Sequence, residues 1–370
     1  MSSPDEPAPR PRKQEQEPAT TEVTEVAHGV LRSQLPIELP GLGHVNCYFL
    51  EDENGVAVVD PGLPGPDSWA ALVDRLGRAG FEVDDVHTVV VTHSHPDHFG
   101  GARRLHDEAD AEIVTHESFR TLFDPGELGS EDSSDLDLNT LDGRLEAIER
   151  RLATPTPWGG RRHGPPPGFF EQVRREGLPA TSPLLASPEP TRRVVDGQTI
   201  KLARREWVAM HTPGHTYDHL CLYDPEHGIV LTGDHVLPSI TPHIGGLTPL
   251  ADPLAVFFDS LGRMAAMTGV TVALPAHGHP FTDLKGRAEH IAEHHVDRLN
   301  TIRQAQADLP NGTVTDFMQV LFQERSWGDM AESETYAHLE HLRELGEVDR
   351  TFDGGVARYA PSGGDSKGTE

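Results

Sequence analysis

The chain has 370 residues, a formal net charge of −28 and two cysteines. No stretch approaches about 18 uncharged apolar residues, which excludes a membrane-spanning helix, and the negative charge disfavours loose binding to nucleic acid or anionic lipid. Two cysteines cannot form a disulfide framework. Because the chain also begins without an apolar signal segment, we predict a cytoplasmic protein.

The first part of the chain, residues 1–22, is rich in Pro, Glu, Gln and Thr. Such a composition cannot bury enough apolar surface to order itself, so we expect a disordered tail. The catalytic domain is predicted to span residues 23–283. Within it, residues 45–50 and 55–59 have the composition of paired strands, and the apolar periodicity predicts a helix over 69–79.

A cluster of potential metal ligands follows the next predicted strand. Residues 88–92, Thr-Val-Val-Val-Thr, form a short β-branched run that is typical of a buried strand. Four possible ligands lie within the six residues after it, namely His93, His95, Asp97 and His98. Imidazole and carboxylate groups at the end of a strand suit zinc and also accept iron or manganese. The sequence therefore predicts a metal site at the edge of a sheet.

The segment 118–193 interrupts the alternation of strands and helices. It contains an acidic stretch with an amphipathic helix predicted around 141–148, and then a Gly- and Pro-rich segment over 158–170. Long irregular segments in compact enzymes often carry function, so we interpret this insertion as a lid over the metals. A surface excursion without substrate contact is the alternative. Arg161 and Arg162 would suit an anionic substrate or form a solvated basic pair.

Three further strand-like runs each end in a tight turn that carries one potential ligand. These runs and their ligands are residues 207–210 with His215, residues 228–231 with Asp234, and residues 270–274 with His277. Glycine and proline in the turns allow the backbone geometry that aims each side chain. One such turn is a weak signal, but four in order predict that the side chains converge on one site.

Several more histidines lie close to these ligands in sequence, namely His219, His235, His243 and His279. They could support the ligands, donate a proton to a leaving group or contact substrate, or be purely structural. His235 is the strongest catalytic candidate because it directly follows Asp234. The apolar stretch 237–244 is a candidate wall of the substrate pocket. Cys47 and Cys221 lie in apolar runs and are expected to be core thiols rather than nucleophiles.

The C-terminal part of the chain is predicted to be mostly helical. Apolar side chains in its first helix follow a three- and four-residue spacing, and two more helices are expected to begin near Thr313 and Ser333. The Asp-Gly-Gly sequence at 353–355 lies between two strand-like runs and predicts a hairpin. Three helices and a hairpin favour a winged-helix-like domain over 284–360, followed by a disordered tail over 361–370.

Charge argues against nucleic-acid binding by this C-terminal domain. Between Asp283 and Ala360, eight Lys or Arg stand against fifteen Asp or Glu. A wing that reads nucleic acid should be basic, because phosphate contacts supply most of the affinity. We therefore interpret the domain as a structural module, as a dimerisation module of a homodimer, or as a wall of the active-site cleft. His294 and His295 are expected to lie on a helix face rather than to bind metal.

The motifs His-x-His-x-Asp-His, Thr-Pro-Gly-His, Gly-Asp and Pro-x-His-Gly, in this order, resemble those of the metallo-β-lactamase fold superfamily. The resemblance covers about residues 26–285 and implies an α/β fold, an αββα sandwich with the metals at one edge. It implies one metal held by His93, His95 and His215, a second held by Asp97, His98 and His277, and Asp234 bridging the two.

Two further features of the chain refine this resemblance. Asp60-Pro61-Gly62 is similar to the Asp-x-Gly turn of the superfamily. Asp234 stands where some β-lactamases of the superfamily use Cys, which points to the glyoxalase II-like branch. With its C-terminal domain, the chain resembles the β-lactamase-like protein 2 group, some members of which are endoribonucleases selective for single strands.

We therefore expect a binuclear hydrolase of a small ester or thioester with two zinc ions, or with iron or manganese in their place. A hydroxide shared by the metals would attack the carbonyl, with Asp97, Asp234 and His235 as the catalytic side chains. This reaction needs no serine or cysteine nucleophile. The alternatives are a phosphodiesterase or endoribonuclease with the same metals, a sulfur dioxygenase with one iron, and a non-catalytic binding protein.

Overall fold

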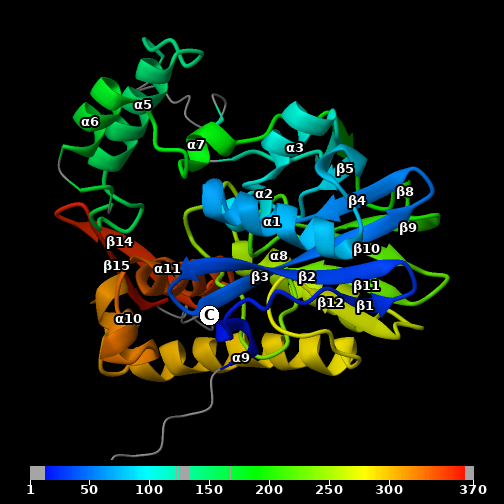
Figure 1. Ribbon diagram of the computed structural model, residues 1–370. Coiled ribbons are helices and arrows are strands. Elements are labelled where there is room, and N and C mark those ends of the chain that lie inside the picture. The colour runs from blue at the N-terminus through cyan, green and yellow to red at the C-terminus, as the bar shows by residue number, and fades with distance from the viewer. Residues whose placement is uncertain (1–12, 122, 125–133, 163, 167, 363–370) are drawn as a thin grey trace, which may run out of the picture.

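The computed structural model describes residues 13–121, 123–124, 134–162, 164–166 and 168–362. Two β-sheets pack face to face, and helices cover the outer face of each sheet (Figure 1). This arrangement is the αββα sandwich that the family resemblance implied. In the described part of the chain, every helix is too short or too polar to span a bilayer.

The first sheet has seven strands in sequence order, antiparallel from β1 to β4 and parallel from β4 to β7. They are β1 (Thr24–Ala27), β2 (Val30–Leu39), β3 (Leu42–Asp52), β4 (Gly55–Val59), β5 (Val86–Val90), β6 (Glu112–His116) and β7 (Arg192–Val194). The helices on this side are α1 (Pro66–Ala79), α2 (Pro96–Phe99) and α3 (Ala102–Ala109). Leu72 of α1 and Leu105 of α3 are buried against the sheet in one cluster with Val58 and Val89.

The second sheet has five strands in the order β12-β11-β10-β9-β8, of which only β11 and β12 are parallel. They are β8 (Thr199–Leu202), β9 (Arg205–His211), β10 (Leu220–Asp224), β11 (Ile229–Gly233) and β12 (Val272–Pro275). Its outer face is covered by α8 (Pro253–Ala265) and α9 (Leu284–Ala305).

Strand β4 shows why the strands that lead to the metal motifs are apolar throughout. Val56 and Val58 face the helices, whereas Ala57 and Val59 face the second sheet. Successive side chains of a strand point to opposite faces, so a strand covered on both sides needs an unbroken apolar run. Trp207 of β9 is fully buried between the sheets.

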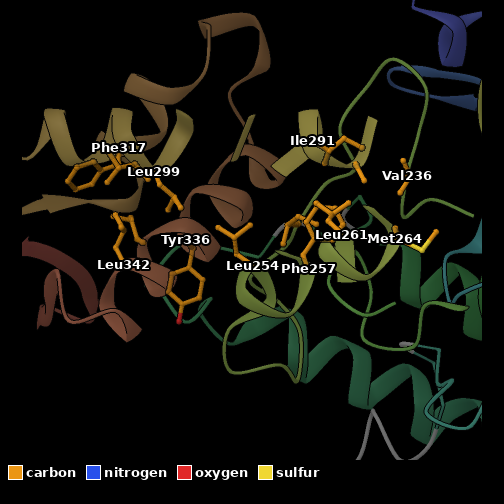
Figure 2. Packing of buried hydrophobic residues seen from close by; sticks show 14 of the residues in the cluster. Val236, Leu254, Phe257, Leu261, Met264, Ile291, Leu299, Phe317, Tyr336 and Leu342 are labelled. Carbon is orange, nitrogen blue, oxygen red and sulfur yellow. The ribbon is translucent and has the colours of Figure 1, made fainter. Parts of the chain in front are cut away.

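The C-terminal helices pack into the same hydrophobic cluster as the outer face of the second sheet. They are α10 (Val314–Leu321) and α11 (Asp329–Glu344), next to a small sheet of β13 (Gly312–Thr313), β15 (Val356–Pro361) and β14 (Val348–Asp353). Figure 2 shows Leu254 and Phe257 of α8 between Val236 on one side and Tyr336 and Leu342 of α11 on the other. Three helices and a hairpin are present as predicted, while the winged-helix-like assignment and the domain boundary stay predictions.

The last long helix begins earlier than the sequence predicted. Helix α11 starts at Asp329 rather than near Ser333, after Gly328. Asp329 and Glu332 lie in its first turn, where acidic side chains interact favourably with the helix dipole. At its other end the chain turns at Gly346, whose φ of 73° lies in the left-handed region that glycine adopts without strain.

The insertion between β6 and β7 forms helices that lie beyond the edges of the two sheets (Figure 1). These are α5 (Leu141–Ala153), which confirms the predicted amphipathic helix, α6 (Phe169–Glu176) and α7 (Pro183–Ala186). Trp158 fixes the insertion to the C-terminal region, because its carbonyl accepts a hydrogen bond from Ala357 N at 3.1 Å. Its ring also lies 5.0 Å from that of Tyr336. Whether the insertion is a lid stays a prediction.

The expected disordered tail is wrong for residues 13–22, while residues 1–12 lie outside the described part. Glu15 is fully buried, and its Oε1 accepts hydrogen bonds from Ser239 N at 2.7 Å and Ile240 N at 3.0 Å. Glu17 O accepts from His44 Nδ1 at 2.7 Å. The prediction of disorder considered only how much apolar surface the segment can bury. The segment is instead held by hydrogen bonds to residues that are distant in sequence.

Candidate metal centre

Four strands deliver the seven predicted ligands to one place. His93, His95, Asp97 and His98 follow β5, His215 follows β9, Asp234 follows β11 and His277 follows β12. The side chains form two groups, and within each group the potential ligand atoms lie within 4.8 Å of one another. The groups are His93, His95 and His215 with Asp234, and Asp97 and His98 with His277. The structure thus brings together all seven side chains that the sequence singled out.

In the first group, three imidazole nitrogens face a common point. His95 Nδ1 lies 3.0 Å from His93 Nε2 and 3.1 Å from His215 Nε2. Nitrogen ligands of a tetrahedral zinc lie roughly 3.3 Å apart, given zinc–nitrogen bonds of about 2.0–2.1 Å. The observed spacing is close to that of three ligands of one ion.

Asp234 lies between this group and the second one. Its Oδ2 is 3.5 Å from His215 Nε2 in the first group and 3.8 Å from His98 Nε2 in the second. Its Oδ1 is 3.3 Å from His277 Nε2. Asp97 Oδ2 completes the second group at 3.5 Å from His98 Nε2 and 3.6 Å from His277 Nε2. One carboxylate thus reaches both groups, as a bridging ligand must.

Three atoms of the centre are buried without a hydrogen-bond partner among the described residues. They are His98 Nε2, His277 Nε2 and Asp234 Oδ1. An unpaired buried polar atom costs free energy, and native proteins leave few of them. Divalent cations would satisfy all three, and the imidazole and carboxylate donors fit zinc, iron or manganese. The residues present therefore fit the metals that the sequence predicted.

Asp60 organises the second group through hydrogen bonds. Its Oδ2 accepts from His98 Nδ1 at 2.9 Å and from Thr92 Oγ1 at 2.8 Å, and its Oδ1 accepts from Thr92 N at 2.9 Å. Because Nδ1 of His98 is occupied, Nε2 remains free to bind a metal. The Asp-x-Gly motif marked this turn in the sequence, but its role emerges only where β4 lies beside the end of β5.

Other ligands are oriented by backbone carbonyls. His215 Nδ1 donates to His243 O at 2.8 Å, and His277 Nδ1 donates to His44 O at 2.6 Å. Both bonds leave Nε2 facing the centre and fix the ring orientation. His44 lies on β3, 233 positions before its partner, so sequence reasoning missed it.

His219 supports Asp234 rather than joining the ligands. Its Nε2 accepts from Asp234 N at 3.0 Å, and its Nδ1 contacts Thr212 Oγ1 at 2.8 Å. Burial and then the nearby His235 and His215 lower its pKa well below the usual range, so the ring is neutral. A neutral ring with Nε2 as acceptor holds the backbone of Asp234 in place.

The charges of the second group stabilise one another. Burial raises the pKa of Asp97, but the neighbouring His98 and His277 outweigh burial and hold that pKa below its ordinary value. Burial lowers the pKa of His98, but Asp97, Asp60 and Asp234 raise it well above its ordinary value. In the first group, burial lowers the pKa of His95 to about 3. Neutral imidazole, the form that binds metals, is thus favoured at His95.

The structure does not favour the catalytic role predicted for His235. Its ring is fully buried, 5.1 Å from that of Phe257, and burial lowers its pKa to about 3. Of the other candidates, His279 is bound to Glu17 at 2.8 Å. Cys47 and Cys221 are buried free thiols, as expected for core positions.

Asp218 is a buried carboxyl that sequence reasoning missed. Ser94 Oγ, from within the first metal motif, donates to Asp218 Oδ1 at 3.1 Å, while Oδ2 has no partner among the described residues. Burial raises the pKa of Asp218 to about 7. No residue pattern marked it, because a single Asp after a Thr-Tyr pair is common in loops.

A polar network joins the centre to the C-terminal helices. The ring of His243, whose carbonyl holds His215, lies 3.4 Å from Glu334 Oε2 on α11. Glu334 is also paired with Arg298 of α9. Together with His295 and His338, Glu334 forms a third buried group with ligand atoms within 4.8 Å.

This third group is better explained by hydrogen bonding than by a metal. His338 Nδ1 donates to Glu334 O at 2.7 Å, and His295 Nδ1 lies 3.1 Å from His338 Nε2. Burial lowers the pKa of His295 to about 2 and that of His338 to about 4, so both rings are neutral. Arg298 already balances the charge of Glu334, and an added dication would be a buried charge without a counter-charge. His295 thus lies on a buried helix face, without a metal role.

Comparison with known proteins agrees with this fold and site. The family model of the metallo-beta-lactamase superfamily matches residues 40–277. A metallo-beta-lactamase family protein from Thermus thermophilus has a TM-score of 0.68 and 29% sequence identity, covering 91% of this chain and 100% of that one. A beta-lactamase domain protein from Burkholderia ambifaria has a TM-score of 0.70 and 27% identity, covering 93% and 95%.

Curated relatives carry names of hydrolases. An atrochrysone carboxyl ACP thioesterase from Aspergillus novofumigatus is 30% identical over 196 residues, which are 52% of this chain and 55% of that protein. The aligned part thus spans about half the length of that relative. A probable metallo-hydrolase from Bacillus subtilis is 22% identical over 328 residues, 86% of this chain and 93% of that protein. Since the family model covers more than half of the sequence, the chain belongs to the metallo-beta-lactamase superfamily.

Proposed function

We propose that this superfamily hydrolase cleaves thioesters, or closely related esters, at a binuclear metal centre. The observation that carries the proposal is the position of Asp234, whose two carboxylate oxygens reach His215 on one side and His98 and His277 on the other. A shared carboxylate between two complete ligand groups is the arrangement that two adjacent cations require.

The residues of the chain would divide the work as follows. His93, His95 and His215 would hold one cation, Asp97, His98 and His277 the other, and Asp234 both. When bound, the two cations would lower the pKa of a shared water and polarise the carbonyl of the substrate. Asp234 would fix the spacing of the pair and Asp97 would orient the attacking water, while Asp60, His44 and His219 keep the ligands oriented.

A thioester suits this site because the reaction needs no strong acid in the protein. Once it has lost a proton to solvent, the water would form a bond from its oxygen to the carbonyl carbon, and the C–S bond would break with its electron pair on sulfur, so that the products are a carboxylic acid and a thiolate. A thiol has a pKa of about 8.5, so it can leave as thiolate. The buried, neutral His235 would then not be required as a proton donor. The names of the ACP thioesterase relatives support the same bond type, whereas the narrower glyoxalase II-like assignment stays a prediction.

The alternatives are less well supported. A phosphodiesterase or endoribonuclease could use the same cations, but the acidic C-terminal region disfavours phosphate-backbone contacts. A sulfur dioxygenase with one iron would leave three ligands of the second group unused.

The test combines metal analysis with two substrate classes. Purified protein is reconstituted with zinc, manganese or iron(II), its metal content is measured by mass spectrometry, and turnover of an acyl thioester is compared with that of bis(p-nitrophenyl) phosphate. We expect about two metal equivalents and preferential thioester cleavage. One iron per chain, or faster cleavage of the phosphodiester, would contradict the proposal.

A further inference from the structure

Two cavities lie at the insertion, and both are lined by Leu152, Arg161 and Arg162. The larger, of about 570 Å³, lies between the end of α5, the Gly- and Pro-rich segment after it and Phe170 of α6. The smaller, of about 310 Å³, lies between α5, the start of α11 and Leu247. Both volumes are in the range of small-molecule sites.

The two arginines give the larger cavity a positive charge. Its described lining contains no carboxylate, although the chain as a whole carries a net charge of −28. Arg161 and Arg162 make no ion pair within the part of the chain that the structure describes, and Arg162 Nε is buried without a partner. Arg161 is exposed, and Asp329 and Glu332 line the smaller cavity beside both arginines. On the side of the larger cavity the two guanidinium groups meet no carboxylate of the described lining, which suits an anionic group, with which arginine forms paired hydrogen bonds.

The smaller cavity has an apolar part, although Arg151, Arg161, Arg162, Asp329 and Glu332 also line it. Phe123, Ile148, Trp158 and Leu247 line it. Of its two carboxylates, Glu332 accepts hydrogen bonds from Trp158 Nε1 at 3.2 Å and Thr315 Oγ1 at 2.7 Å, and Asp329 also has a polar partner. The site as a whole would therefore accept a ligand with an anionic end and a less polar stem.

The chain itself limits how far this site lies from the metal centre. Leu247 of the smaller cavity is four residues after His243, whose carbonyl accepts from the metal ligand His215 at 2.8 Å. Four residues span at most about 14 Å, so the cavity begins within that distance of a residue that touches a ligand.

We propose that Arg161 and Arg162 bind the phosphate of a thioester whose thiol is a phosphopantetheine-type arm, with the arm along the smaller cavity and the thioester at the metals. This proposal rests on the proposed function and specifies its substrate class. The phosphate could belong to coenzyme A or to the prosthetic group of a carrier protein, since both present the same arm.

The test measures selectivity rather than activity alone. kcat/KM is determined for three thioesters of the same acyl group, with coenzyme A, with an acyl carrier protein and with N-acetylcysteamine, which lacks the phosphate. In the variant Arg161→Gln/Arg162→Gln, the ratio of the phosphate-bearing substrate to N-acetylcysteamine should fall about tenfold to a hundredfold, because charge-assisted hydrogen bonds to phosphate are lost. The substrate whose ratio falls further identifies the source of the arm.

A matched control removes two arginines from the same insertion. Arg174→Gln/Arg175→Gln on the exposed side of α6 changes the net charge equally and should leave the ratio unchanged. An unchanged ratio in the Arg161/Arg162 variant, or an equal fall in both variants, would overturn the proposal.

Binding separates this proposal from the thioesterase activity. If no thioester is hydrolysed, the proposed function fails. Calorimetric titration of the full chain with free coenzyme A then still tests whether Arg161 and Arg162 bind the phosphate. Binding that is lost in the Arg161→Gln/Arg162→Gln variant supports the site, and absence of binding to the unaltered chain refutes it. Thermal unfolding of both double variants verifies that each is folded.

Discussion

Replacing Asp60 with Asn tests whether hydrogen bonds behind the ligands are needed for metal binding. Asp60 accepts three hydrogen bonds, from Thr92 N, Thr92 Oγ1 and His98 Nδ1, at 2.8–2.9 Å. An Asn side chain has one oxygen, which accepts, and one NH₂ group, which only donates. It therefore loses either the bond from Thr92 N or the bonds from the two donors that share Oδ2. At about 1.5–3 kcal/mol for each bond to a charged group, losing one or two of them gives a destabilisation of about 1.5–6 kcal/mol.

The same change should weaken metal binding. A misplaced His98 ring would cost about 10–100-fold in affinity, the effect typical of residues that orient metal ligands. Affinity is measured by competition with a chromophoric zinc chelator, and stability by urea unfolding of the metal-free protein. The control is Asp110→Asn, because Asp110 has the same φ of 56° as Asp60 but is exposed. Unchanged zinc affinity in Asp60→Asn would refute the reasoning.

Three other substitutions test separate parts of the structure. His95→Ala should lower the metal content and reduce turnover by more than the roughly 10–100-fold of an orienting residue, without loss of the circular dichroism spectrum; full metal content would contradict its assignment. Glu15→Ala should destabilise the protein by about 2–4 kcal/mol in urea unfolding, because Ser239 N and Ile240 N lose their acceptor, while the exposed Glu22→Ala should have no effect. Asp218→Asn should stabilise the metal-free protein at pH 8 but not at pH 4: burial raises the pKa of Asp218 to about 7, so its favourable protonated form is lost as the pH rises through 7. Equal effects at both pH values would exclude a buried, protonated carboxyl.

The ligand set could be predicted because each ligand directly follows a recognisable local sequence pattern. The apolar run before His93 and the turns before His215, Asp234 and His277 are contiguous in sequence. A strand buried on both faces must be apolar, and a chain that leaves it through a Gly or Pro turn places the next polar side chain at the sheet edge. The fold was implied by the resemblance of these metal-binding motifs, in their order along the chain, to those of one superfamily.

The orientation of the ligands could not be predicted in this way. The hydrogen bond between Asp60 and His98 joins residues 38 positions apart, and that between His44 and His277 joins residues 233 positions apart. The periodicity of the sequence carries no information about such bonds. The docking of Glu15 was missed for the same reason, since its partners come from a loop 224 positions away. The predicted role of His235 rested on its proximity to Asp234 in sequence, which does not determine the direction of a side chain.

The sequence by itself determined which side chains can bind metal and which strands carry them, because strand burial and turn geometry are properties of short segments. The tertiary structure alone decided which ring nitrogens face the centre, which residues hold them there, and that the C-terminal helices share a core with the second sheet. These outcomes depend on contacts between distant segments, and the hydrogen-bonding partner of a buried polar group is defined only when the chain has folded.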